Sequence, residues 1–179
     1  MDKALIDTSI LLEPFIPWKN KEPNYKSNTL ALLTGNLTEF HRRFQPVVSL
    51  SVLGELNLIL SEKIHLIKGI EKTKKKEEMD RILEDFFFKC EKTGLKKETF
   101  EIADNLIKFD DRLDPLDTLH ISTAIVEGCK TFIFIDYKLK DNRKVDKYLK
   151  EKYGLFLTPF NIPKNEDSRK PNQKFTWVE

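Results

Sequence analysis

The stretch DPLDTLHISTAIVEGCKTFIFIDYKL, residues 114–139, predicts the fold class of this chain. Asp114 is a typical helix N-cap and Pro115 suits the first helical position, so we expect a helix to begin here. We expect it to end near Gly128, because glycine readily takes the left-handed conformation that follows many helices. Residues 131–135 are apolar and β-branched or aromatic, which predicts a buried strand. A helix followed by a buried strand is typical of an α/β fold.

Two carboxylates mark the ends of this helix–strand unit. Asp117 falls in the first turn of the predicted helix, where a negative charge interacts favourably with the helix dipole. Asp136 follows the predicted strand directly. In open α/β sheets, ligands bind at the carboxyl ends of the strands, so this pair of acids indicates a candidate site.

The composition is that of a globular protein. The 179 residues suggest one domain with a substantial core, and 40% of them are hydrophobic, including 13 Phe. The net charge is only +2, so a surface that binds nucleic acid would have to come from local clustering. The absence of a long apolar run, of a signal-peptide pattern and of a CxxC motif predicts a cytoplasmic protein without a membrane span or zinc site.

Further apolar runs predict the remaining strands. Residues 3–6 (KALI) and 46–50 (PVVSL) each precede helical patterns, and residues 155–158 (LFLT) follow the last one. Strands that alternate with helices indicate a mainly parallel sheet with helices on both faces. We therefore predict a three-layer α/β/α domain over residues 1–160, followed by a loose or docking tail over residues 161–179.

Helical spacing of apolar residues predicts the main helices. They are expected over residues 26–44, with a break at Gly35, and over residues 79–90 and 99–109. Residues 69–78 contain KTKKKEE, and such a charge run is typical of solvated surface or of a connection.

Basic residues gather directly after Asp136. Residues 138–152 contain seven cations against three acids. Most of these cations are expected to form a solvated helix face. Lys138 and Lys140 lie nearest Asp136 and are the candidate phosphate contacts.

Four acids occupy equivalent positions in this predicted fold. Asp7 and Asp136 follow strands, whereas Glu55 and Asp117 lie in the opening turns of helices. Alone, each would be interpreted as a helix cap or dipole partner, but strand ends and the following helix starts share one edge of a parallel sheet. Clustered carboxylates repel one another, and a hard divalent cation such as Mg²⁺ relieves that repulsion. Such ions can orient a water and stabilise charge on a phosphodiester.

Four motifs in sequence order carry a family resemblance. They are IDTSILL at 6–12, SLSVLGEL at 49–56, LDTLHISTA at 116–124 and FIFIDYKL at 132–139. In this order they resemble the PIN domain family, which includes VapC-type toxins, and the third motif is the most specific. The resemblance implies a PIN-like domain with Mg²⁺- or Mn²⁺-dependent ribonuclease activity on RNA. Members of the family commonly dimerise, so the resemblance also makes a homodimer an expectation.

The same resemblance assigns the acids. It implies that Asp7, Asp117 and Asp136 hold the metal, and that Glu55 completes the catalytic site or orients the attacking water. The proline-rich loop after Asp7, the lysine-rich segment and the C-terminal tail make the chain longer than a minimal toxin. This favours an RNA-processing role over a toxin role, so the expected partner is an RNA-processing protein or an antitoxin.

Two further side chains are expected to support the acids. The resemblance implies that Ser9 does so by hydrogen bonding. His120 lies three residues after Asp117, on nearly the same face of the predicted helix. We predict that His120 is bonded to a neighbouring carboxylate or carbonyl, because a hard Mg²⁺ site prefers oxygen ligands.

Other readings of the sequence remain open. The family often has Thr or Ser two residues before the last acid, where this chain has Phe134. This favours the alternative of a catalytically inactive PIN-like module that binds RNA or acts as a scaffold. A haloacid-dehalogenase-type phosphatase fits less well, because Asp7 is followed two residues later by Ser9 instead of a second Asp. A response-regulator domain would leave Glu55 and Asp117 unexplained.

Overall fold

The computed structural model describes residues 1–15, 23–63, 70–135 and 137–160. Asp136 and the predicted tail over residues 161–179 lie outside the described residues. Among the described helices, none combines the length and the apolar character that a membrane crossing requires.

Five parallel strands form a single sheet in the order β3-β2-β1-β4-β5. The strands are β1 (Asp2–Ile6), β2 (Phe44–Ser49), β3 (Glu91–Thr93), β4 (Thr131–Phe134) and β5 (Phe156–Pro159). The four strands predicted from apolar runs are present, with ends that differ by one or two residues. β3 was not predicted, because its three residues include Glu91 and Lys92 and form no apolar run.

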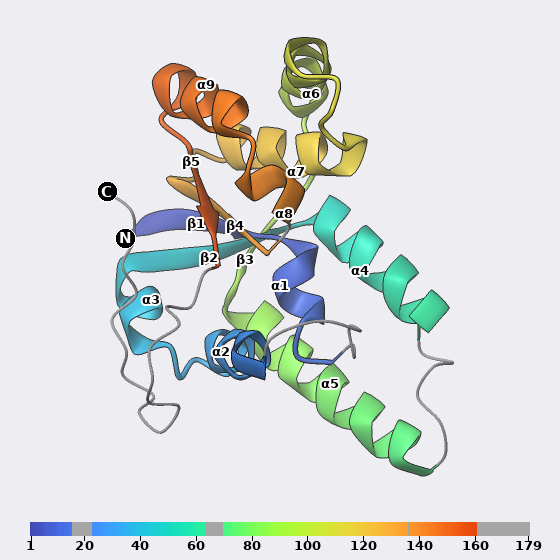
Figure 1. Cartoon of the computed structure of the whole chain (residues 1–179). Helices are drawn as coiled ribbons and strands as arrows, with labels where there is room; N and C mark the ends of the chain where they lie inside the picture. Colours follow the sequence, from blue (N-terminus) through green and yellow to red (C-terminus); the bar gives the residue numbers. More distant parts are fainter. Residues whose placement is uncertain (16–22, 64–69, 136, 161–179) are drawn as a thin grey trace.

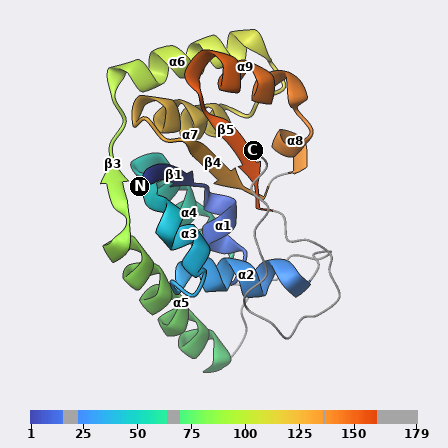
Figure 2. The same ribbon diagram turned by 90° about the vertical axis from the view of Figure 1, so that its left-hand side faces the viewer.

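Helices cover both faces of the sheet, which confirms the three-layer arrangement (Figure 1). One face carries α1 (Thr8–Leu12), α2 (Pro23–Leu33), α3 (Thr38–Arg43) and α5 (Ile70–Lys89). The other face carries α6 (Lys97–Phe109), α7 (Pro115–Val126) and α9 (Arg143–Tyr153), and Figure 2 shows these helices from a second direction. The two remaining helices are α4 (Leu50–Lys63), which contacts both α1 and α7, and α8 (Tyr137–Lys140).

The lysine-rich segment is helical where the structure describes it. Residues 70–78 form the first half of α5, so their interpretation as a connection was wrong. The side chains of residues 73–78 are exposed, as expected of solvated surface. Lys and Glu are good helix formers, and Met79 is the first buried apolar residue among the described side chains of α5.

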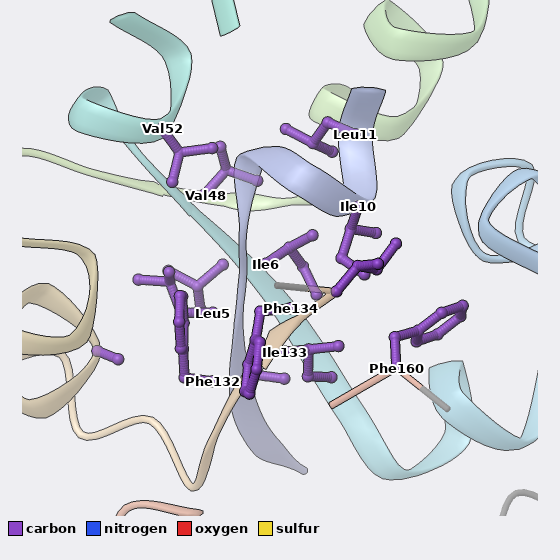
Figure 3. Packing of buried hydrophobic residues seen from close by; sticks show 14 of the residues in the cluster. Leu5, Ile6, Ile10, Leu11, Val48, Val52, Phe132, Ile133, Phe134 and Phe160 are labelled. Carbon is purple, nitrogen blue, oxygen red and sulfur yellow. The ribbon is translucent and has the colours of Figure 1, made fainter. Parts of the chain in front are cut away.

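The central strands are fixed by the hydrophobic core (Figure 3). Leu5 and Ile6 of β1 are fully buried, and every residue of β4 is buried. Ile10 of α1 and Phe160 after β5 belong to the same core. This packing fixes the carboxyl ends of β1 and β4 in place.

These two strand ends lie at a topological switch point. β1 pairs with β2 on one side and with β4 on the other, so the connections that leave β1 and β4 run in opposite directions across the sheet. The Asp7 N–H donates to the carbonyl oxygen of Ile133 at 3.0 Å, which extends the pairing of β1 with β4 by one step. Crevices at such switch points are where open α/β sheets bind ligands.

Candidate functional site

Asp7 begins the site at the end of β1, where it is also the N-cap of α1. Its Oδ2 accepts hydrogen bonds from the Ser9 backbone N–H (3.1 Å) and from Ser9 Oγ (2.5 Å). Ser9 Oγ in turn accepts from the backbone N–H of Ile135 at 3.0 Å. The Asp7 side chain is therefore held from both strand ends, and Ser9 makes the hydrogen bond that was expected of it.

His120 lies on α7 and meets Asp7 from the opposite side. Its side chain is fully buried, and Nδ1 lies 3.2 Å from Asp7 Oδ1. An ionised carboxylate can only accept, so Nδ1 carries the proton. This confirms the expected hydrogen bond between His120 and a neighbouring carboxylate. His120 Nε2 lies 3.8 Å from Glu55 Oε2 and has no hydrogen-bond partner among the described residues.

Glu55 on α4 completes a compact group with these two residues. Thr8 Oγ1 donates to Glu55 Oε2 at 2.5 Å and so fixes the carboxylate beside His120. One ligand atom each from Asp7, Glu55 and His120 lies within 4.8 Å of the other two. Thr8 was not predicted to belong to the site, because its contact with Glu55 depends on the packing of α1 against α4.

The neighbouring acids raise the pKa of His120. Burial by itself lowers the pKa of His120, but the hydrogen bond to Asp7 and the negative charge of Asp7 raise it. The charges of Glu55 and Asp117 act in the same direction. The net result is a pKa above the usual 6.5, because the carboxylates stabilise the imidazolium.

An open cleft of about 730 Å³ adjoins this group. Asp117 in the first turn of α7 is partly exposed and lines the cleft together with Glu55. The other charged or amide side chains that line the cleft are Arg112, Asp114, Asp141 and Asn142.

The remaining predicted site residues stand apart from this arrangement. Asp136 and the side chain of Lys138 lie outside the described residues, so their predicted roles stay predictions. Lys140 is exposed at the end of α8 and is absent from the described lining of the cleft. The structure therefore brings together Asp7, Glu55 and His120, with Asp117 in the adjoining cleft.

Phe134 takes the place where the family often has a hydroxyl. Its side chain is 1% exposed and stacks on Phe132, with ring centroids 5.7 Å apart. Phe134 belongs to the hydrophobic core (Figure 3). The hydroxyl next to Asp7 comes from Ser9 instead.

The donor set fits a divalent cation. It combines two carboxylates with a buried imidazole nitrogen that lacks a hydrogen-bond partner in the described structure. Carboxylates suit Mg²⁺ and Mn²⁺, and imidazole is a ligand for first-row transition metals. Asp7 and Glu55 could thus contribute to one metal site, and His120 Nε2 could join them in the neutral form of the ring.

No protein-family model and no curated protein matches the sequence, but solved structures match the fold. A chain in the crystal structure of VapBC2 from Rickettsia felis, bound to a DNA fragment from their promoter, aligns with a TM-score of 0.54. The alignment covers 88% of this chain and 98% of that chain at 17% sequence identity. The fold is PIN-like.

Two further structures are similar. A chain of FitAB bound to an IR36 DNA fragment gives a TM-score of 0.50 at 18% identity, over 86% of this PIN-like chain and 94% of that chain. The crystal structure of FitAcB from Neisseria gonorrhoeae gives 0.49 at 18% identity, over 86% and 96%. At these identities the similarity concerns the fold.

Proposed function

We propose that this chain is a divalent-metal-dependent endoribonuclease that hydrolyses RNA phosphodiester bonds. The observation that carries the proposal is the compact Asp7, Glu55 and His120 group, at the switch point of a PIN-like fold and beside an acidic cleft. The motif resemblance described above supports the same activity, and we propose on that basis that Asp117 and Asp136 belong to the acidic site. Residues 1–160 would form the nuclease domain.

Some of the side chains would hold the metal ion, and others fix the orientation of the residues that hold it. Asp7 and Glu55 would hold a Mg²⁺ or Mn²⁺ ion with Asp117 and Asp136, directly or through water. When bound, the ion supplies a polarised water and neutralises charge on the phosphodiester. Ser9 and His120 fix the two oxygens of Asp7, one from each side.

Glu55 is the candidate for orienting the attacking water. Thr8 restrains Glu55 Oε2, which places the carboxylate at the boundary between the buried group and the open cleft. A carboxylate in this position can accept a proton from water that enters from the cleft.

Cleavage of a labelled single-stranded RNA pool tests the function. The wild-type chain is compared in Mn²⁺, Mg²⁺ and EDTA with the Asp7→Asn and Asp117→Asn variants. Asp85→Asn serves as a matched control, because Asp85 is exposed on α5, which contributes no described residue to the cleft. We expect cleavage that needs the metal, disappears in both site variants and persists in the control. Equal cleavage by all variants would refute the proposed site.

The catalytically inactive module is the second candidate. Phe134 favours it, because a buried phenyl ring replaces a hydroxyl near the last predicted acid. Mn²⁺ binding separates the two functions, since an inactive module has no need to bind the ion.

A second protein chain is the proposed partner for a toxin role. The matched chains come from the structures of VapBC2 and FitAB, both of which are bound to a DNA fragment. Co-expression with the product of a short neighbouring reading frame would test for an antitoxin, with relief of growth arrest as the readout. The proposed homodimer is tested by the molar mass of the purified chain in solution.

A further inference from the structure

Arg112 is held by the buried carboxylate of Asp110, its anchor in the loop between α6 and α7. Its Nε donates to Asp110 Oδ1 at 2.8 Å, and its Nη2 donates to Oδ2 at 2.6 Å. Asp110 is 4% exposed and also accepts from Asn142 Nδ2 at 3.1 Å. Asn142 is the N-cap of α9, so the anchor joins two separate segments beside the cleft.

The anchor leaves part of the guanidinium available. Asp110 takes one edge of the planar group, whereas arginine carries five N–H donors in a fork. The Arg112 side chain is 70% exposed, and its Nη1 has no hydrogen-bond partner within the described structure. Asp110 thus positions the Arg112 guanidinium along one edge, and another edge is open to a ligand.

The charge around Arg112 indicates the chemistry of that ligand. The carboxylates of Glu55, Asp114, Asp117 and Asp141 also line the cleft. Arg112 is the single cation among its described lining residues. A polyanion that enters such a cleft is repelled by the acids and needs a fixed positive group. A preorganised guanidinium binds phosphate oxygens with paired hydrogen bonds, which a mobile lysine cannot do.

We infer that Arg112 binds a backbone phosphate of single-stranded RNA and so positions the strand over the acidic group. The choice of ligand rests on the proposed function. Asp110 and Asn142 act as positioning residues for Arg112. The rival explanation is that the Arg112–Asp110 pair only stabilises the loop between α6 and α7.

Binding of a fluorescent single-stranded RNA over a series of salt concentrations distinguishes these explanations. Binding is measured in Ca²⁺ instead of Mn²⁺. Ca²⁺ also takes oxygen ligands, and the exchange is made so that binding to the uncleaved RNA is measured. We expect Arg112→Gln to weaken binding to every RNA sequence tested. Because one phosphate contact is lost, the slope of log affinity against log salt should fall by about 0.7. Arg112→Lys should retain the slope and lose affinity, since it keeps the charge without the fork.

Arg81→Gln is the matched control, because Arg81 is exposed on α5, away from the described lining of the cleft. An equal change of slope in this control would overturn the inference. It would also be overturned if Arg112→Gln lowers the thermal midpoint without changing RNA affinity, or if the wild-type chain binds no RNA. Arg112-dependent binding without any cleavage in Mn²⁺ would contradict the proposed function and leave this inference standing.

Discussion

Asp7 Oδ1 at the end of β1 and His120 Nδ1 on α7 lie 3.2 Å apart, although 113 positions separate the two residues in sequence. The contact joins the central strand to the helix that presents Asp117 to the cleft. It also places an ionisable imidazole against the acids proposed to hold the metal. The protonation of His120 is therefore expected to affect both folding and the proposed metal binding.

The first prediction concerns the stability of the metal-free chain. The folded pKa of His120 is raised above its usual 6.5, so its contribution to stability is complete below that value and is lost as pH rises through the folded pKa. We expect the urea midpoint in EDTA to fall as the pH rises above the usual pKa of 6.5. His120→Asn keeps a donor near Asp7 but does not titrate, so this part of the decline should disappear. An identical decline in the variant would contradict the prediction.

The second prediction concerns stabilisation by the metal. Saturating Mn²⁺ at about 100 times its Kd stabilises the state that binds it by about 2.7 kcal/mol. For a chain of this length that corresponds to a rise in Tm of about 5–10 °C. Asp7→Asn should remove the rise, because it removes a charged ligand of the group. Asp85→Asn should retain it, and differential scanning calorimetry with and without EDTA provides the measurement.

The third prediction concerns the stability of the chain at low pH. The hydrogen bonds from Arg112 and Asn142 hold the pKa of Asp110 well below its usual 3.8, although burial opposes them. Its contribution to stability is therefore present above that value and is lost as pH falls towards the folded pKa. Asp110→Asn should lower the Tm at neutral pH and reduce the further loss on acidification. The neighbouring exposed Asp111→Asn should behave like the wild type in both tests.

Local signals in the sequence were sufficient for the placement of Asp7, Glu55 and Asp117. The Asp114–Pro115 pair predicts the start of α7, and the structure shows Asp114 accepting from the Leu116 N–H at 2.8 Å. Strand and helix boundaries therefore located these acids at one edge of the sheet. The same reasoning could not identify an edge strand such as β3, whose residues pair through backbone groups with β2.

Contacts between side chains that are distant in sequence could not be predicted from local patterns either. The Thr8–Glu55 bond depends on how α1 packs against α4, and the Asp110–Asn142 bond spans 32 positions. Neither pair has a characteristic spacing. The anchored arginine beside the cleft became visible only with the tertiary structure.

The last prediction tests whether Phe134 limits the site or supports the fold. Phe134→Thr introduces the hydroxyl that the family often carries, but it removes a ring that is 1% exposed and stacked on Phe132. Large-to-small substitutions of this kind leave a cavity and cost about 3–5 kcal/mol. We therefore expect a large fall in the urea midpoint and no gain in Mn²⁺ affinity, since Ser9 already supplies a hydroxyl to Asp7.

Phe88→Thr is the matched control for this substitution. Phe88 is 89% exposed on α5, so the same change should alter the free energy of unfolding by less than about 0.5 kcal/mol. If Phe134→Thr instead strengthens Mn²⁺ binding, the phenyl ring weakens the metal site in this chain, and the inactive module becomes the better description of the wild type. Weakened folding with unchanged Mn²⁺ affinity would place Phe134 in the core alone. The acidic group would then hold its metal without a hydroxyl at position 134.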